Sequence, residues 1–232
     1  MSAKWIFFDI GDVLFNENAP HVLYFHSLLA AMRRNGVEVT WDEYNAAIIE
    51  CVKRSPAESV TDAARSFVND PALWEKIFHD GRGVYDAIRK PRPYGVLLDN
   101  ITEVIHKLNP QFKLGIIANQ HIEVVQALDD YGIAELFDVK VIDKVVGVSK
   151  PDPGIFEIAL KEAGCTPQEA VMVGDRPDND IFPAKSLGMR TVRFRRGLLY
   201  VHYEPQSELE TADIEVIQTA ELAEAIIKIA IA

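Results

Sequence analysis

Carboxylates and a lysine stand directly after or between several apolar segments of the chain. Asp9 follows the apolar run 5–8, Asp175 follows the run 170–174, and Asp180 comes five residues later. Lys150 precedes a Pro-Asp-Pro sequence between the runs 139–142 and 170–174. Carboxylates that converge from two strands beside a lysine can hold a hard divalent cation and a phosphoryl group together. The cation screens the anions and the lysine neutralises the remaining charge.

The elements that must position these side chains are short, continuous apolar runs. Such runs are typical of strands buried on both faces, and they occur at residues 4–9, 112–118, 139–142, 170–174, 191–194 and 214–217. Helix-start signals lie between the later runs, namely Asp152-Pro153 and the capping box Thr166-Pro-Gln-Glu169. The alternation predicts an α/β fold with a doubly wound parallel sheet. In such sheets ligands bind at the carboxyl ends of the strands, where the polar residues stand.

The segment 17–90 has a different pattern, because helical signals crowd together and no strand-like run is present. Thr40-Trp-Asp-Glu43 is a capping box, and Asp70-Pro71 predicts the start of a further helix. The proline-rich stretch Arg89-Lys-Pro-Arg-Pro93 is typical of a hinge. We therefore expect a core formed by residues 1–16 and 91–232, with an all-helical insertion at 17–90.

Composition narrows the classes of function. The 232 residues carry a formal charge of -11, which disfavours nucleic acid and anionic membranes as partners. Two cysteines are too few for a disulfide scaffold or a cysteine metal cluster, and no apolar run is long enough to span a membrane. These features predict a cytoplasmic protein.

Four ordered motifs resemble those of the haloacid dehalogenase superfamily. They are Phe8-Asp-Ile-Gly-Asp-Val-Leu14, Ile117-Ala-Asn119, Lys150-Pro-Asp-Pro153 and Val173-Gly-Asp-Arg-Pro-Asp-Asn-Asp180. Each motif alone is weak, but the ordered set with its strand and helix spacing is specific. The resemblance implies a Rossmann-like core, and the insertion resembles the helical cap of the superfamily's first cap class.

The resemblance also implies roles for individual residues. Asp9 would be the nucleophile that forms an aspartyl-phosphate, and Lys150 would stabilise charge on it and on the phosphoryl oxygens. Mg²⁺ would be held by Asp9, the carbonyl of Gly11 and Asp175. Outside this set, Asp180 and Asn179 would hold the lysine or a metal-bound water.

Two positions depart from the superfamily's phosphatases. The usual second aspartate, which protonates the leaving group, is replaced by Gly11, and the usual hydroxyl of the second motif is replaced by Ala118. We expect Asn119, Gln120 and nearby backbone N–H groups to contact the phosphate instead. Asp12 is one residue beyond the usual acid and is either its substitute or a turn residue.

The sequence therefore predicts a Mg²⁺-dependent phosphatase of small phosphorylated metabolites, with weakened general acid catalysis. General acid assistance contributes about 10²–10⁴ in rate, so good leaving groups, such as those of acyl or aryl phosphates, should be preferred. Two alternatives stay open. One is a 2-haloacid dehalogenase, because a halide leaves without a proton; the other is a noncatalytic binding protein that keeps the fold.

Overall fold

The computed structural model describes residues 2–54, 59–89 and 95–232. The chain forms two compact units. The first comprises Met1–Asn16, Val96–Arg196 and Pro205–Ala232, and the second comprises Glu17–Gly95 and Gly197–Glu204. The chain therefore passes between the units more than once, and each unit is built from segments distant in sequence.

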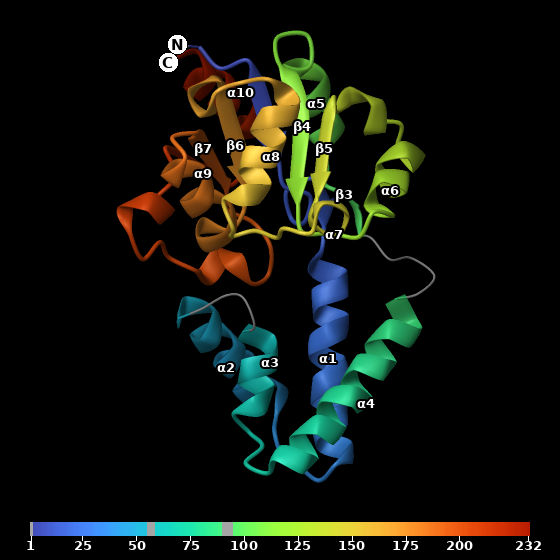
Figure 1. Ribbon diagram of the computed structural model, residues 1–232. Helices are drawn as coiled ribbons and strands as arrows, with labels where there is room; N and C mark the ends of the chain where they lie inside the picture. Colours follow the sequence, from blue (N-terminus) through green and yellow to red (C-terminus); the bar gives the residue numbers. More distant parts are fainter. Residues whose placement is uncertain (1, 55–58, 90–94) are drawn as a thin grey trace. The chain divides into compact units, whose positions relative to one another are not determined.

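A six-stranded parallel sheet forms the centre of the first unit (Figure 1). Its strand order is β5-β4-β1-β6-β7-β8. The strands are β1 (Trp5–Phe8), β4 (Lys113–Ala118), β5 (Val139–Ile142), β6 (Ala170–Gly174), β7 (Arg190–Phe194) and β8 (Ile214–Val216). The expected doubly wound α/β fold is confirmed. The predicted strand positions agree with the observed ones to within two residues.

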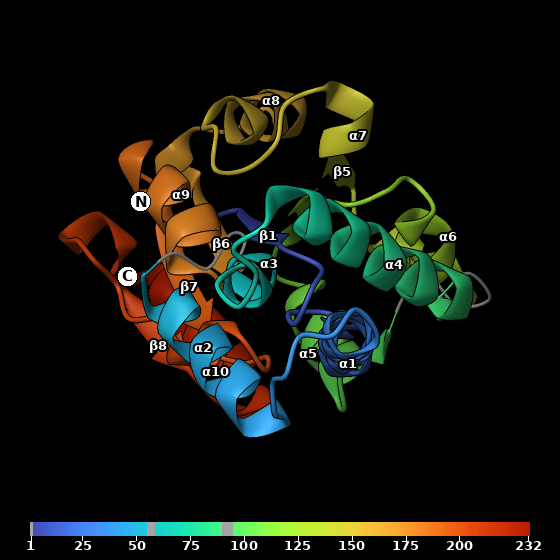
Figure 2. The same cartoon turned by 90° about the horizontal axis from the view of Figure 1, so that it is seen from below.

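Helices cover both faces of this sheet, as Figure 2 shows for α8 on one side and α5 and α10 on the other. They are α5 (Ile101–Leu108), α6 (Val124–Asp130), α7 (Asp143–Val146), α8 (Gly154–Ala163), α9 (Phe182–Ser186) and α10 (Thr219–Ile231). The apolar side of α8 packs with Phe7 and Ile117 of the central strands. Close packing there requires Gly115, since a Cβ at this position would lie 2.5 Å from the Phe7 ring.

A two-stranded antiparallel sheet stands where the chain leaves the first unit and returns to it. It pairs β2 (Phe15–Asn16) with β3 (Val96–Leu97). Each strand is only two residues long, too short for a periodic pattern, so the sequence did not predict this pair.

The regular secondary structure of the second unit is helical, as far as its residues are described. It contains α1 (Asn18–Arg34), α2 (Trp41–Arg54), α3 (Ser59–Arg65) and α4 (Pro71–Arg89). Its buried core includes residues from all four helices, among them Leu28, Tyr44 and Ile77, and also Leu199 and Tyr203. The segment Gly197–Glu204 thus belongs to this unit, although the sequence-based division assigned it to the core.

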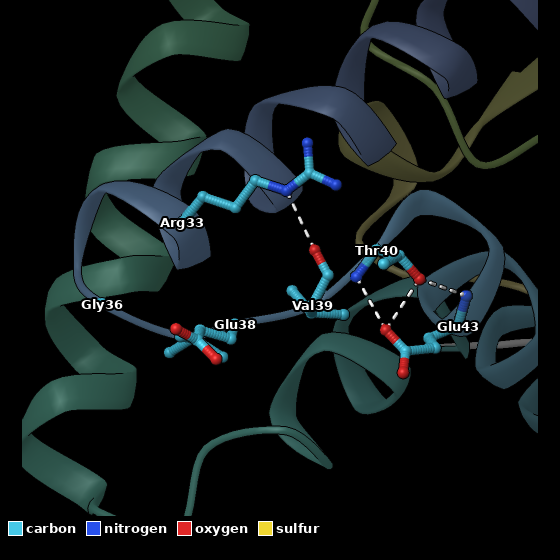
Figure 3. Close-up of a pocket in the computed structure, with 7 residues that line it drawn as sticks. Arg33, Gly36, Glu38, Val39, Thr40 and Glu43 are labelled. Atoms are coloured by element: carbon cyan, nitrogen blue, oxygen red, sulfur yellow. Dashed lines mark hydrogen bonds between the residues drawn. The ribbon is translucent and has the colours of Figure 1, made fainter.

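Helix starts in the second unit follow the predicted signals. The Glu43 carboxylate accepts hydrogen bonds from the N–H and Oγ1 of Thr40, and the N–H of Glu43 donates to Thr40 Oγ1, which confirms the capping box. Figure 3 shows these bonds and the one that Arg33 Nε donates to the Val39 carbonyl. The same residues line a hollow of about 630 Å³. The polar side chains that line the hollow thus include three already bonded to other residues of the segment 33–43, namely Arg33, Thr40 and Glu43.

Two further expectations concern the ends of elements. Asp70 Oδ1 accepts a hydrogen bond from the N–H of Ala72 at the start of α4, as its place before Pro71 predicted. Apart from Arg89, the expected hinge 89–93 lies outside the described residues. None of the described helices has the length and apolar character needed to cross a bilayer.

Candidate active site

Lys150 joins two carboxylates at the carboxyl ends of the central strands. Its Nζ lies 2.7 Å from Oδ1 of Asp9, which follows β1, and 2.6 Å from Oδ1 of Asp180, which follows β6. The Lys150 side chain is 1% exposed and that of Asp180 is fully buried. These ion pairs are thus shielded from solvent. Buried charges interact far more strongly than charges at a surface. Residues separated by 141 and 30 positions in the chain meet at one point.

Asp175 adds a third carboxylate to this cluster. One carboxylate oxygen from each of Asp9, Asp175 and Asp180 lies within 4.8 Å of the others. Asp175 is 2% exposed, and its Oδ2 is buried without a hydrogen-bond partner among the described residues. An unsatisfied buried carboxylate oxygen is costly, and a divalent cation would satisfy it.

The surroundings of Asp180 differ from those of Asp175. The N–H of Arg176 donates to Asp180 Oδ2 at 3.0 Å, while Lys150 bonds Oδ1, so protein donors reach both oxygens of Asp180. A short π-helical turn, Pro177–Ile181, carries Asp180 back over the end of β6. Gly174 makes this possible, since a Cβ there would lie 2.3 Å from the Cβ of Asp180. Of the three carboxylates, Asp9 and Asp175 are therefore better placed to bind a cation directly.

The buried charges shift one another's protonation. Burial raises the pKa of Asp9 to about 6 even though Lys150 pulls it down, and Asp180 adds to the rise. Burial and the negative charges of Asp180, Asp9 and Asp12 raise the pKa of Asp175 well above its ordinary value. Burial lowers the pKa of Lys150, but Asp180 and Asp9 outweigh this and raise it. The cluster has an excess of negative charge, which favours a bound cation.

The turn after β1 carries Gly11 and Asp12. Gly11 forms an isolated bridge with Phe15, and the N–H groups of Leu14 and Phe15 both donate to the carbonyl of Ile10. Asp12 is 3% exposed and has a positive φ of 50°, a conformation that a non-glycine residue seldom adopts. Its charge reaches Asp175, whose pKa it raises. The turn thus places a carboxylate in the site, one residue later than in the superfamily's usual pattern.

The end of β4 holds Lys150 by its backbone. The Asn119 side chain donates from Nδ2 to the Lys150 carbonyl and accepts at Oδ1 from the Lys150 N–H, each at 2.8 Å. Ala118 is fully buried and presents only a methyl group, Gln120 is half-buried, and His121 is exposed. The amide predicted to contact the phosphate therefore holds the lysine, a contact that sequence spacing could not reveal.

Three other polar residues, in or next to the motifs, differ in their burial and their bonding partners. Asn179 is 6% exposed within the π-helical turn. Arg176 makes a two-point ion pair with Asp178. Asp143, which sequence reasoning missed, accepts a 2.8 Å bond from Ser149, the residue before Lys150. Asp143 begins α7 directly after β5, and an aspartate at the start of a helix was the sequence signal that could have drawn attention to it.

Comparison with known proteins identifies the family. Residues 3–188 match the family model described as haloacid dehalogenase-like hydrolase. The chain belongs to this family. As a haloacid dehalogenase-like hydrolase, it is an enzyme whose four motifs meet at the site described above.

Several relatives resemble the chain over nearly its whole length. It is 36% identical over 238 residues to a protein named glyceraldehyde 3-phosphate phosphatase from Methanopyrus kandleri, covering 98% of each chain. It is 31% identical to the Escherichia coli protein named pyrimidine 5'-nucleotidase YjjG, covering 90% of this chain and 91% of the relative.

Solved structures of haloacid dehalogenase-like hydrolases share the fold. The Bacillus subtilis putative hydrolase YfnB, described as bound to magnesium, has a TM-score of 0.68 at 17% identity and covers 97% of this chain and 99% of its own. A predicted phosphoglycolate phosphatase from Haemophilus somnus has a TM-score of 0.69 at 20% identity, with 97% and 98% covered. At these identities the similarity concerns the fold alone.

Proposed function

We propose that the protein is a Mg²⁺-dependent phosphatase of small phosphorylated metabolites, acting through Asp9. The observation that carries the proposal is the buried cluster in which Lys150 Nζ lies 2.7 Å from Asp9 and 2.6 Å from Asp180. It includes Asp175, whose Oδ2 is bonded by none of the described residues. An acidic cluster with an unsatisfied oxygen suits a hard cation next to a nucleophile. Such a cluster gives no advantage to a dehalogenase, which needs no metal.

In the proposed reaction the Asp9 carboxylate attacks phosphorus. A bond forms between Asp9 Oδ and phosphorus while the bond to the leaving oxygen breaks, and that oxygen leaves with the electron pair. Water then attacks the aspartyl-phosphate, which releases inorganic phosphate and restores the carboxylate. Lys150, 2.7 Å from Asp9, stabilises the negative charge that gathers on the phosphoryl oxygens.

The proposed magnesium ligands are Asp9, the carbonyl of Gly11 and Asp175. When bound, magnesium would supply charge neutralisation at the phosphoryl group. Asp180 holds Lys150 through Oδ1 and Arg176 N–H through Oδ2. Asn179, in the same turn, would assist it. The protein's contribution is thus a prearranged set of charges.

Proton delivery to the leaving group is the weak part of the proposed mechanism. Gly11 has no side chain to donate a proton, and Ala118 offers the phosphate no hydroxyl. We propose Asp12 as a partial substitute, since it is buried in the turn beside the cluster and its charge reaches Asp175. Because it stands one residue away from the usual position, we expect weak protonation and a preference for good leaving groups.

The names of the relatives suggest where to search for the substrate. Two full-length relatives are named glyceraldehyde 3-phosphate phosphatase, and a third is named pyrimidine 5'-nucleotidase. A protein named phosphoserine phosphatase matches over 39% of this chain. We propose a three-carbon phosphate as the first class to test. Because Gly11 and Ala118 remove two reactive side chains, we expect turnover of such a ligand to be weak.

The test is phosphate release from a panel of phosphorylated metabolites with Mg²⁺. The panel contains glyceraldehyde 3-phosphate, phosphoserine, a pyrimidine 5'-monophosphate, acetyl phosphate and an aryl phosphate. Asp9→Asn is the inactive control, and Asp42→Asn, at an exposed position of α2, is the matched control. Turnover that is lost only in Asp9→Asn supports the phosphatase. Binding of a metabolite without product, measured by calorimetry, would contradict the proposed phosphatase activity on that metabolite.

A further inference from the structure

Arg193, in β7, is a buried cation that the proposed mechanism does not use. It is 1% exposed and is the largest fully buried side chain among the described residues. Arginine is seldom buried to this extent unless it is paired, because removing its charge from water is costly. Its neighbours along the strand, Val192 and Phe194, are ordinary apolar core residues. The charge at position 193 therefore calls for a partner of its own.

The register of the sheet shows which residues surround Arg193. It pairs with Gly174 of β6 on one side and with Glu215 of β8 on the other. Side chains of residues paired in register project from the same face of a sheet. On that face Asp180 fills the position over Gly174, where a Cβ would lie 2.3 Å from the Cβ of Asp180, and Gly174 immediately precedes Asp175.

The guanidinium group bridges these two neighbouring strands. Its Nε donates to the backbone carbonyl of Asp175 at 3.4 Å, and its Nη1 lies 3.0 Å from Oε2 of Glu215. Glu215 is anchored further by Arg195, whose Nη1 lies 3.3 Å from Oε1. Arg193 thus links the peptide group of Asp175 to the edge strand β8.

We propose that Arg193, held by Glu215, is a positioning residue that keeps the Asp175 carboxylate in the geometry that binds the divalent cation. The inference rests on the proposed function, which assigns Asp175 as a magnesium ligand. The planar guanidinium suits this task because its donors are fixed in one plane and can bond a carbonyl and a carboxylate together. Without Arg193, the backbone carbonyl of Asp175 loses a charged hydrogen-bond donor. The Asp175 carboxylate then becomes ordered only when the cation binds.

The test measures magnesium binding directly, by calorimetry on metal-free protein without substrate. Groups that orient metal ligands typically contribute about 10–100-fold to metal affinity. We expect Arg193→Met to weaken Mg²⁺ binding about tenfold. Arg193→Lys, which keeps the charge but loses the planar donors, should weaken it about threefold. At saturating Mg²⁺ the substrate KM should stay within about twofold of the wild type, because the proposed role of Arg193 is to position Asp175 and not to bind the substrate.

Two further variants control for loss of charge and for folding. Arg195→Met removes a cation that pairs with the same Glu215 carboxylate, and it should leave the Mg²⁺ affinity within about twofold. Glu215→Gln alters a side chain that is 39% exposed, so it should fold even if Arg193→Met does not, and it should weaken binding about threefold. Folding of each variant is checked by circular dichroism.

The outcomes separate this inference from the proposed function. If Asp175→Asn binds Mg²⁺ as well as the wild type does, the proposed metal site itself is wrong. If Asp175→Asn abolishes binding while the folded Arg193 variants bind like the wild type, only the role of Arg193 is overturned. Should Arg193→Met not fold, unchanged binding by Glu215→Gln overturns it.

Discussion

Two regions of the candidate active site are built in contrasting ways. Beside the ends of β1 and β6, a charge-binding region is formed by Asp9, Lys150, Asp175 and Asp180. Asp180 and Lys150 are buried and bonded to each other, and Gly174 leaves room for the turn that carries Asp180. After β1 and β4, the positions that would handle the leaving group and the phosphate carry Gly11 and Ala118. The charge-binding region keeps its carboxylates and its lysine, whereas the proton-delivering region, formed by Gly11 and Ala118, has no side chain that could donate a proton. Binding and covalent transfer can persist in such a site even where protonation of the leaving group is slow.

The largest effect should come from Lys150→Met, which removes the cation shared by two buried carboxylates. We expect turnover to fall about 10²–10³-fold, because loss of one preorganised charge at a developing anion has this magnitude. The free energy of unfolding should also fall by about 3–5 kcal/mol at neutral pH, since Asp9 and Asp180 lose their buried partner. Steady-state kinetics and urea unfolding measure both effects.

Lys53→Met is the control for Lys150→Met, since Lys53 pairs with Glu50 on the exposed surface of α2. It should change neither quantity appreciably. Turnover of Lys150→Met within twofold of the wild type would remove the charge-binding region from the mechanism.

Gly11→Asp tests the proton-delivering region, because it places a carboxylate two residues after Asp9. We expect turnover of an alkyl phosphate to rise about 10²-fold, at the lower end of the contribution of a general acid. Acetyl phosphate, whose leaving group needs no proton, should change little. A uniform rise on both substrates would show that the new side chain acts on binding and not on the leaving group.

Asp12→Asn asks whether the neighbouring carboxylate already supplies part of that function. Turnover of alkyl phosphates should fall about tenfold, while turnover of acyl phosphates stays close to the wild type. Asp99→Asn, at an exposed position in the first unit, is the matched control. If Asp12→Asn leaves the turnover of every substrate and its pH profile unchanged, Asp12 is only a turn residue.

Gly174→Ala tests the packing beneath Asp180. A Cβ at position 174 would lie 2.3 Å from the Cβ of Asp180 and 2.6 Å from its Oδ2, so the carboxylate that holds Lys150 must shift. We expect a loss of about 1–3 kcal/mol in the free energy of unfolding, typical of overpacking, and a severalfold loss of turnover.

Gly83→Ala is the matched control for Gly174→Ala. No atom lies within 4 Å of a Cβ at position 83, inside α4, so this change should stabilise the protein by about 0.5–1 kcal/mol. Equal stability effects for the two glycines would contradict the packing argument.

The contrast between the two regions also explains what the sequence could reveal. Apolar runs ending in Asp9 and Asp175 predicted both the parallel sheet and the convergence of these carboxylates, because parallel strands end at one edge. The two hydrogen bonds between the Asn119 side chain and the Lys150 backbone were not predictable, since they join residues 31 positions apart through side-chain geometry. For the same reason, no local pattern marked Gly197–Glu204 as part of the helical unit.

A final prediction concerns pH and the protonation of Asp9 in the charge-binding region. Burial raises the pKa of Asp9 to about 6, and nucleophilic attack requires the carboxylate. At limiting Mg²⁺, kcat/KM should therefore rise with pH and fall at least tenfold per unit below about pH 6, because cation binding also requires ionised Asp175, whose pKa is raised as well. Asp12→Asn should leave this limb in place, because the limb reports the nucleophile and not the acid.

Stability of the metal-free protein should change in the opposite direction. The folded state favours protonated Asp9, so its contribution to the free energy of unfolding is full below the ordinary pKa of 3.8 and is lost as pH rises through about 6. Urea unfolding of the wild type and of Asp9→Asn between pH 4 and 7 isolates this contribution as the difference between the two slopes. Identical slopes, or a flat rate profile from pH 5 to 8, would mean that Asp9 is ionised throughout. The buried cluster would then already carry enough positive charge without a metal.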